Sequence, residues 1–556
     1  MDKHTIFGSV YPESLLADVQ GPGRKTIYGA WVATEEFYKA LLKYGTFGEY
    51  HFFVRPENIN TLKKKISSLR VNKCNLKLLP LDGLPSYFKK VKYTVFFNGD
   101  PGLSKLADLR LRYAAQYFPL CAITHTVSYS WMLERVFFMN MLSDLRSFDS
   151  ITCSSTTLLR AIKNLNKLVS TALRKEKGFV LNYKGRLDHL PLGINSGDYG
   201  KIDKADARKR LGLSGDKFII LYFGRLSLYD KLDIYPLLAA FRELLLKNKD
   251  TMLILGGKSN ETNYVLEVKG MAKNLGILHG LKFILNTSLT KKSLLYCASD
   301  IFVSPSDNIQ ESFGITVLEA MASGLPAVVS DWNGYKDLVI HNHTGFRVPT
   351  YWTRCDQDIR PGLPEDDWVR HHLLLAQSVC VDIKEMVRYI LILMNNKQLR
   401  LNLGLNAKKT AFEKYDWSNL VPKYERLWKE LSGLSRGHKI SRKKAPLFTP
   451  GYFDSFRHYP SKILDEKTNV LISEYGRMFL KIKKFPFVVQ PELKNTISAQ
   501  IIFLILSFLL GRGEATIEDI ENHAARITGR PSLYSVRYNL MWLLKKGLIR
   551  CGFAPN

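Results

Sequence analysis

The stretch from Asp300 to Asp331, DIFVSPSDNIQESFGITVLEAMASGLPAVVSD, contains the residues that best indicate the fold of this chain. An apolar run, a polar loop, a Gly-containing turn, an apolar helical pattern and a second apolar run follow one another. This order predicts two parallel strands joined by a helix. A helix that begins near Phe313–Ile315 would present free N–H groups and the positive end of its dipole, which suit an anionic phosphate.

Two carboxylates flank the turn in this stretch. Glu311 precedes the helix and can accept hydrogen bonds from sugar hydroxyls, whereas Glu319 inside the helix can accept from two hydroxyls of a ribose. Gly314 would let a ligand approach the main chain because it has no Cβ. We therefore expect Phe313, Gly314, Ile315 and Glu319 to contact the ligand. The alternative is that the two carboxylates only form the acidic start of an ordinary helix.

The same alternation of strands and helices runs through the first two thirds of the chain. Strands are predicted at 4–11, 49–54, 75–81, 93–99, 120–126 and 150–155, and then at 218–227, 251–257, 281–286, 300–306 and 326–331. Short apolar strands that alternate with amphipathic helices predict parallel sheets covered on both faces. We therefore expect an α/β protein with two Rossmann-like domains, 1–195 and 196–435. Ligands bind beyond the carboxyl ends of such strands, which predicts a cleft between the domains.

The last part of the chain has a different pattern. We expect a basic linker and irregular segment over 436–494, followed by a small, mainly helical domain over 495–556 with three helices and a short strand. This domain resembles a winged helix, and basic and aromatic residues of its last helix can meet phosphates or bases: Tyr534, Arg537, Tyr538, Lys545 and Lys546. The same helix also carries an ordinary apolar stripe. Docking to another protein or within the chain itself is the favoured interpretation, and nucleic acid is the less favoured partner.

The stretch that contains Glu311 and Glu319 resembles the family-4 glycosyltransferases, retaining enzymes of the GT-B fold that use nucleotide-sugar donors. The resemblance covers roughly residues 1–432 and rests on the Glu-x7-Glu spacing, on EAMASGLPAVVSD, and on the later turns GYKDLV and TGFRV. The chain departs from the family at Asp337, where Glu is usual, and at Asn286-Thr287, where a Gly commonly follows the strand.

The resemblance implies roles for several further residues. Gly224, Arg225 and Lys231 match positions that hold the donor diphosphate, and fixed cations there would stabilise the charge that grows on the leaving phosphate. His125 matches a histidine that contacts the donor sugar, although a lone histidine can equally be structural. Gly29 matches the family's Gly-rich loop only loosely. Glu311, Arg225, Lys231 and His125 are therefore the expected catalytic residues.

The resemblance also implies the reaction. We expect transfer of a hexose-type group, with retention, from a nucleotide-diphosphate sugar such as a UDP-sugar to a glycan, lipid-linked or peptide acceptor bound by the first domain. No cofactor and no metal are expected, because the cationic pair can neutralise the diphosphate. Asp356 and Asp358 form an Asp-x-Asp pattern, which we interpret as part of a solvated acidic loop. The alternative function is a regulatory or nucleic-acid-binding protein whose first two domains sense a nucleotide-sugar.

Composition bears on partners and location. The net charge is +29, and both ends of the chain are more basic than its middle, which favours anionic partners. Basic residues recur at helical spacing in RAIKNLNKLVSTALRKEKG (160–178), typical either of a membrane-docking face or of a solvated helix. Seven dispersed cysteines and no visible secretory signal predict a cytoplasmic protein, and contact with the inner face of the membrane stays open. The oligomeric state is not predicted.

Overall fold

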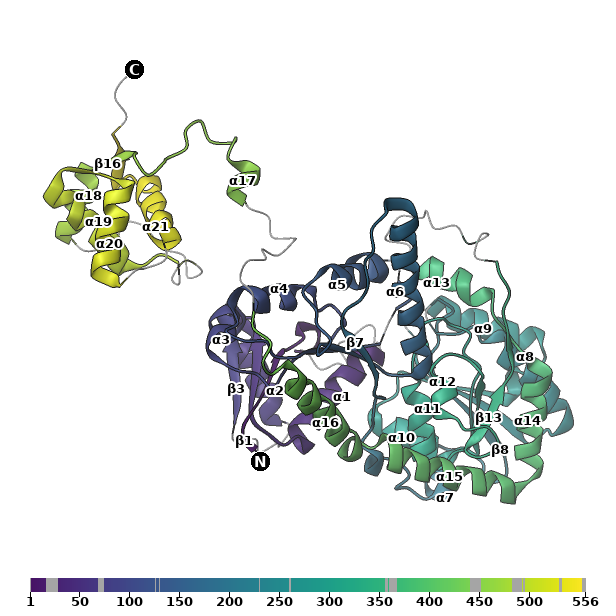
Figure 1. Ribbon diagram of the computed structural model, residues 1–556. Coiled ribbons are helices and arrows are strands. Elements are labelled where there is room, and N and C mark those ends of the chain that lie inside the picture. The colour runs from purple at the N-terminus through teal and green to yellow at the C-terminus, as the bar shows by residue number, and fades with distance from the viewer. Residues whose placement is uncertain are drawn as a thin grey trace. The chain divides into compact units, whose positions relative to one another are not determined.

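The computed structural model describes residues 2–16, 29–68, 75–125, 127–129, 131–229, 231–259, 262–355, 359, 368–440, 452–482, 493, 496–529 and 533–552. The chain forms two compact units, Met1–Leu447 and Phe448–Asn556 (Figure 1). The first unit contains two parallel sheets, each in its own lobe. This is the expected α/β architecture of two Rossmann-like domains.

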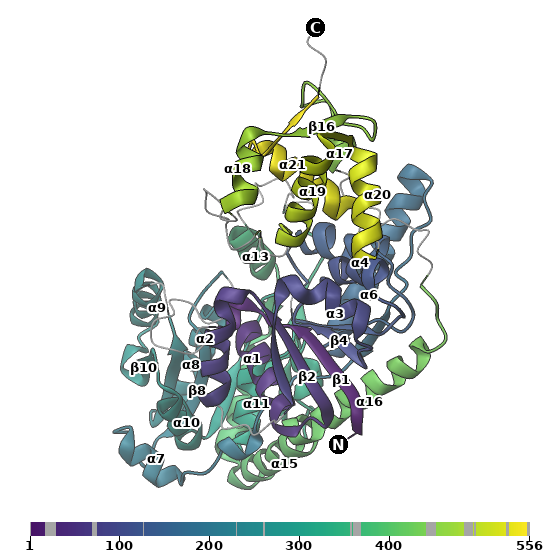
Figure 2. The ribbon, with the colours of Figure 1, turned by 90° about the vertical axis from the view of Figure 1, so that its left-hand side faces the viewer.

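The first sheet is entirely parallel, in the order β3-β2-β1-β4-β5-β6-β7. Its strands are β1 (Asp2–Val10), β2 (Phe47–Val54), β3 (Leu76–Pro80), β4 (Val95–Asn98), β5 (Leu120–Thr124), β6 (Ser150–Cys153) and β7 (Arg186–His189). Strands β2, β4, β5 and β6 are almost fully buried, as expected of a sheet covered on both faces (Figure 2). The sequence-based interpretation missed β7, a half-exposed edge strand.

Helices connect these strands and cover both faces. They are α1 (Gly29–Tyr44), α2 (Ile59–Ser68), α3 (Leu84–Lys90), α4 (Ser104–Tyr113), α5 (Phe138–Leu142) and α6 (Thr156–Lys177), with a π-helical turn at Met132–Phe137 and short 3-10 turns at Glu13–Leu15, Pro56–Asn58 and Leu81–Gly83. Aromatic side chains of the sheet pack in two layers: one against α1, the other against α3 and α4.

The second sheet is also parallel, in the order β10-β9-β8-β11-β12-β13. Its strands are β8 (Phe218–Arg225), β9 (Thr251–Lys258), β10 (Leu281–Leu285), β11 (Ile301–Ser304), β12 (Ala327–Ser330) and β13 (Gly345–Val348). The helices of this lobe are α7 (Lys204–Arg210), α8 (Tyr235–Lys247), α9 (Thr262–Asn274), α10 (Leu289–Ala298), α11 (Ile315–Ala322), α12 (Tyr335–Leu338), α13 (Trp368–Gln377), α14 (Ile383–Asn395) and α15 (Lys397–Tyr415). A short antiparallel pair, β14 (Thr350–Tyr351) and β15 (Cys380–Val381), and 3-10 turns at Ser196–Asp198 and Leu278–Gly280 complete it.

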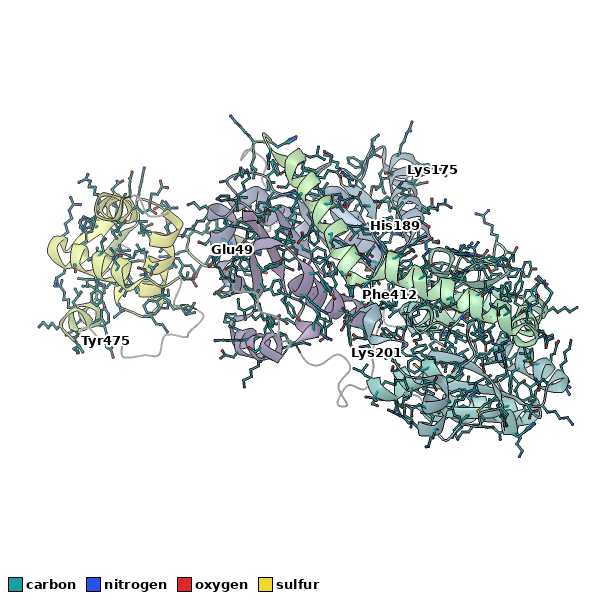
Figure 3. The ribbon with its side chains drawn as sticks, turned by 90° about the horizontal axis from the view of Figure 1, so that it is seen from below. Glu49, Lys175, His189, Lys201, Phe412 and Tyr475 are labelled. Atoms are coloured by element: carbon teal, nitrogen blue, oxygen red, sulfur yellow. The ribbon has the colours of Figure 1, made fainter. Side chains whose placement is uncertain are left out.

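The two lobes are joined by two crossings of the chain that run side by side. Ile194 N–H donates to Tyr415 O at 3.0 Å, and Trp417 N–H donates to Ile194 O at 3.1 Å. Helix α16 (Trp417–Ser435) then returns to the first lobe (Figure 3). Its Trp417 and Trp428 are fully buried. The ring of Trp428 lies 5.3 Å from that of Phe7 in β1. The last helix of the first unit is therefore part of the core of the first lobe.

The second unit has its own core. It contains α17 (Tyr452–Phe456), β16 (Asn469–Ile472), α18 (Glu474–Ile482), α19 (Ala499–Arg512), β17 (Glu514–Thr516), α20 (Ile517–Thr528), α21 (Leu533–Lys545) and β18 (Ile549–Cys551). The strands form an antiparallel sheet in the order β17-β16-β18. Thr516 and Asp519 form a capping box at the start of α20.

Part of the segment expected to be an irregular linker is ordered in this unit. Val470 and Ile472 of β16 and Phe479 of α18 are buried in its core, so the ordered module begins before residue 495. The alternation over NVLI spans only four residues, which is too short to mark a strand by sequence pattern alone. No helix among the described residues is long and apolar enough to cross a membrane.

A buried ion pair fixes the first sheet to its covering helices. Arg110 of α4 donates to both carboxylate oxygens of Asp149, at 2.5 and 2.7 Å. The backbone N–H groups of Leu120 and Arg146 donate to the same carboxylate at 2.8 and 2.7 Å. Both side chains of the pair are fully buried. Asp149 thus depends on Arg110 for the neutralisation of its charge.

We predict that Arg110→Met lowers stability by about 3–5 kcal/mol, because it leaves a buried carboxylate without its counter-ion. The measurement is the apparent Tm of the full chain by circular dichroism. Arg112→Met is the matched control, since Arg112 lies on the same helix and is exposed. Equal melting of the two variants would contradict a structural role for the pair.

Candidate functional site

The carboxyl ends of β8 and β11 bring Lys231 and Glu311 together. Lys231 Nζ forms an ion pair with Glu311 Oε2, although eighty positions separate them in sequence. The two side chains are only 13% and 11% exposed. Glu311 immediately precedes the turn into α11, so the pair lies beside the N-terminus of that helix. The structure therefore places a cation, a carboxylate and a helix N-terminus at one point of the second lobe.

The turn before α11 has a shape that only glycine permits. Gly314, the N-cap residue of α11, has φ +112°, and a Cβ there would lie 2.5 Å from the ring of Tyr335. Gly334 approaches the other side of the turn, where a Cβ would lie 2.3 Å from Ser312 O. Gly334 N–H also donates to Glu311 O at 3.1 Å. These contacts fix the first turn of α11 in place.

Two buried polar atoms near this turn lack hydrogen-bond partners among the described residues. They are Thr316 Oγ1, in the first turn of α11, and Gln310 Nε2, in the loop before Glu311. Buried polar atoms in proteins are nearly always paired, with protein groups, water or a ligand. They flank Glu311 in sequence, so each is a candidate for a hydrogen bond with water or with a polar ligand atom.

Arg225 and Gly224 lie at the end of β8, on the segment that leads to Lys231. Arg225 is half-buried, and its carbonyl oxygen accepts a hydrogen bond from the Tyr222 hydroxyl at 2.8 Å. A Cβ at Gly224 would approach the Tyr222 hydroxyl to 2.8 Å and Lys231 Cε to 3.3 Å. The small residue at 224 thus leaves the space through which the Lys231 side chain extends.

His125 follows β5 of the first lobe and meets the same turn. Ser312 Oγ donates to His125 O at 2.7 Å, which links the two lobes directly. Burial lowers the pKa of the His125 ring to about 4, so the ring is neutral near pH 7.

The hydrogen bonds around His125 also settle its tautomer. The Thr34 hydroxyl donates to Ala30 O at 2.8 Å, so at the 3.2 Å contact with His125 Nε2 it must accept. The proton of the neutral ring is therefore on Nε2, and Nδ1 carries a lone pair. Nδ1 is buried and has no hydrogen-bond partner among the described residues. It can accept a hydrogen bond from a ligand hydroxyl.

Glu319 is held by a network that the sequence did not reveal. Its Oε1 accepts from the Tyr199 hydroxyl at 3.0 Å and pairs with Lys292 Nζ, and its Oε2 accepts from the Tyr296 hydroxyl at 2.9 Å. Its side chain is 4% exposed. That Glu319 accepts from two ribose hydroxyls stays a prediction. For such contact, the two tyrosine hydroxyls and the lysine would have to move away or bind the carboxylate together with the ribose. Lys292 and Tyr296 lie four residues apart on α10, a spacing that places them on one helix face.

The remaining residues expected to contact the ligand lie in three different environments: core, partly buried and exposed. Phe313 is buried, and its ring lies 6.1 Å from that of Tyr415, so its side chain belongs to the core. Ile315, in the first turn of α11, is partly buried. Gly29 is the first residue of α1 and is exposed, with no atom near the position of a Cβ. Residues 17–28, which precede it, lie outside the described residues.

The two departures from the family pattern have structural explanations. Asn286 has φ +53°, the left-handed conformation that glycine adopts readily and asparagine tolerates. Asp337 connects the lobes, since its carboxylate accepts from the backbone N–H and the hydroxyl of Thr156, both at 2.6 Å. The ring of His189 lies 3.6 Å from the same carboxylate. Asp337 therefore holds the N-terminus of α6 against the second lobe.

A second buried carboxyl, Asp307, lies in the loop after β11. It is 3% exposed and accepts from Asp233 N–H at 3.3 Å to each oxygen. Burial raises its pKa to about 7, and the nearby Asp233 adds to the effect. The Asp233 carboxylate in turn accepts from Gln377 Nε2 of α13 at 3.1 Å. The sequence analysis did not identify Asp307, because its environment depends on segments distant in sequence.

No group of His, Cys, Asp and Glu among the described residues could hold a metal ion. Asp356 and Asp358, which form the Asp-x-Asp pattern, lie outside the described residues.

Comparison with known proteins relates this chain to glycosyltransferases. Residues 203–360 match the family model described as glycosyl transferases group 1. An uncharacterised glycosyltransferase of Methanocaldococcus jannaschii is 28% identical over 270 residues, which are 47% of this chain and 58% of that protein. A D-inositol 3-phosphate glycosyltransferase of Actinosynnema mirum is 30% identical over 188 residues, 32% of this chain and 44% of that protein. The chain thus spans about half the length of the curated relatives it matches.

Solved structures show the same fold. A glycosyltransferase from Rickettsia africae superposes with a TM-score of 0.52 at 16% identity, over 78% of this chain and 99% of that one. HepE of Anabaena, solved in complex with UDP, gives a TM-score of 0.51 at 16% identity, over 77% of this chain and 99% of that one. The first unit therefore has the GT-B fold, as expected from the sequence.

We predict that Asp307→Asn stabilises the protein in a pH-dependent way. The folded state holds the Asp307 proton up to about pH 7, whereas the unfolded chain releases it near 3.8, so the wild type loses stability as pH rises between these values. The variant cannot ionise. Its apparent Tm should exceed that of the wild type by a margin that grows from pH 4 to pH 7. The corresponding difference in the free energy of unfolding is on the order of 4 kcal/mol at most. Exposed Asp216→Asn is the control; a difference independent of pH would contradict the assignment.

We predict that Lys292→Met destabilises the protein by about 3 kcal/mol, because Glu319 remains as a buried, unpaired charge. The double variant Lys292→Met/Glu319→Gln should recover much of the loss, since the amide carries no charge, and its oxygen accepts from one tyrosine hydroxyl while its NH2 group donates to the oxygen of the other. Thermal unfolding of the variants measures both effects. Lys291→Met, at the exposed neighbouring position, is the control. A double variant less stable than Lys292→Met alone would refute the network.

Proposed function

We propose that this chain is a retaining glycosyltransferase that moves a hexose-type sugar from a nucleoside diphosphate to an acceptor hydroxyl. The observation that carries the proposal is the meeting of Lys231, Glu311 and the N-terminus of α11, beside the unpartnered Thr316 hydroxyl. Lys231 and the N–H groups of α11 can bind a diphosphate, and the carboxylate of Glu311 can accept from sugar hydroxyls. The glycosyltransferase relatives and the GT-B fold support the same class of reaction.

The donor diphosphate would lie between Lys231, Arg225 and the first turn of α11. Bond cleavage at the anomeric carbon leaves negative charge on the departing phosphate, and fixed cations and helix N–H groups stabilise that charge without reorganisation. Two cations are enough to neutralise the diphosphate, which favours metal-independent transfer. UDP is the first nucleotide to test, because HepE of Anabaena was solved with UDP.

The remaining residues would position the sugar. Glu311 can hold its hydroxyls when Lys231 turns to the phosphate, because the two side chains share one ion pair in the present structure. His125 Nδ1 can accept from a hydroxyl on the side of the first lobe. In a front-face transfer the leaving phosphate takes the proton of the acceptor hydroxyl as the new glycosidic bond forms. This route requires no nucleophilic side chain.

The first lobe would bind the acceptor, a glycan, a lipid-linked molecule or a peptide. The alternative, a nucleic-acid-binding factor that acts through the second unit, has less support. Arg537 of α21, a candidate phosphate contact, pairs through its guanidinium with Glu521 at 3.1 Å and Glu466 at 3.0 Å. Its charge is therefore already engaged within that unit.

We predict that a nucleoside diphosphate raises the apparent Tm, because it binds only the folded state. A thermal-shift screen of UDP, GDP, ADP and their sugars identifies the donor. Arg225→Ala and Lys231→Ala should each abolish the shift and the slow hydrolysis of the donor sugar. Lys249→Ala, at an exposed site on the turn before β9, should keep both. A shift of equal size in all four proteins would overturn the assignment of the diphosphate site.

A further inference from the structure

Helix α6 has a basic side and a core side. Leu158 and Ile162 are buried, and the half-buried Leu165, Val169 and Leu173 continue this core side along the helix. The exposed basic residues lie on the opposite side: Arg160, Lys163, Lys167, Arg174 and Lys175. The N-terminus of α6 is held by Asp337, so the basic side is carried on a helix fixed at one end.

The other end of α6 presents apolar side chains to solvent. Gly178 has φ +69° and ends the helix, with its N–H donating to Arg174 O at 3.2 Å and the Phe179 N–H donating to Leu173 O at 3.3 Å. These bonds fix the turn that carries Phe179 and Val180, which are 68% and 75% exposed. In Figure 1 one end of α6 projects from its lobe, and Figure 3 places Lys175 at the margin.

The charge around this apolar turn is strongly positive. The sequence from 160 to 184 contains seven Lys and Arg residues and one carboxylate, Glu176, which lies 3.7 Å from Lys175. Leu168, on the outer side of α6, is 59% exposed and adds a third apolar side chain. Exposed apolar side chains within a cationic surface are typical of segments that lie in the headgroup region of anionic bilayers.

We propose that residues 160–184, which are most of α6 and the turn after it, form an anchor that binds an anionic lipid surface. The basic side chains contact headgroup phosphates, and Phe179 and Val180 insert below them. A bilayer offers partners for both kinds of side chain, whereas a nucleic-acid backbone would pair the cations and leave the two apolar side chains in water. The anchor does not depend on the sugar-transfer reaction.

The first test removes the apolar side chains. Phe179→Ser/Val180→Ser in the full chain should bind at least about tenfold more weakly to vesicles of equimolar phosphatidylcholine and phosphatidylglycerol, as measured by co-sedimentation. Leu246→Ser/Leu405→Ser is the matched control, since these leucines are 72% and 66% exposed on α8 and α15. All four side chains are exposed, so the variants should melt like the wild type. Equal vesicle binding by both double variants would overturn the proposal.

The second test reverses the charge of two lysines at the C-terminal end of α6. Each lysine near an anionic surface contributes about fivefold to binding, so Lys175→Glu/Lys177→Glu should weaken vesicle binding at least about 25-fold. Lys249→Glu/Lys409→Glu, with the same net change at exposed positions elsewhere, should weaken it much less. This control matters because the whole chain, at +29, is attracted to any anionic surface.

Two further readouts separate the lipid from other anions. Vesicle binding should fall with added salt and be negligible for pure phosphatidylcholine. Equal binding to neutral vesicles would overturn the proposal. Binding of the wild type to duplex DNA or RNA that is lost in Lys175→Glu/Lys177→Glu but kept in Phe179→Ser/Val180→Ser would also overturn it, because the surface would then be a nucleic-acid site.

Discussion

The paired crossing of the chain between the lobes is the constraint on which the rest of the first unit depends. Ile194 exchanges backbone hydrogen bonds with Tyr415 and Trp417, and Asp416 accepts from Ser196 N–H at 3.0 Å while capping α16. Because Trp417 and Trp428 of α16 are buried in the first lobe, the core of the first lobe is incomplete without the helix that follows the second lobe in sequence. The crossing thereby fixes which strand ends meet, and it brings His125 of the first lobe to the turn before α11.

In the candidate functional site, the buried carboxylates of Glu311 and Glu319 each form an ion pair with a lysine. Lys231 with Glu311, and Lys292 with Glu319, form pairs of opposite charge, so neither buried carboxylate is left without a cation. In the proposed function the first pair would exchange partners, with the diphosphate contacting Lys231 and the sugar hydroxyls contacting Glu311. His125 and Asp307 are both neutral over much of the range below pH 7, for the same reason of burial. The proposed donor site is thus arranged for a ligand that brings its own negative charge.

Sequence patterns predicted the central strands because these are apolar, buried and flanked by clear turns, as in DIFVSPS and PAVVSD. They failed at β7, β13 and β16, which are short strands with little apolar alternation, and β13 lies in the expected turn TGFRV. Motif spacing located Lys231 and Glu311, which the structure pairs. It did not identify Tyr199 and Lys292 as partners of Glu319, because those contacts join segments 120 and 27 positions away. The tautomer of His125 likewise follows only from Thr34, on a helix that precedes it by 91 positions.

The most direct test of the central claim is a crystal structure of the full chain soaked with the nucleoside diphosphate that binds best. The account predicts density for the diphosphate at the N-terminus of α11, with a phosphate oxygen in contact with Lys231 and the Lys231–Glu311 pair opened. A diphosphate bound elsewhere, with that pair intact and the Thr316 hydroxyl still without a partner, would contradict it.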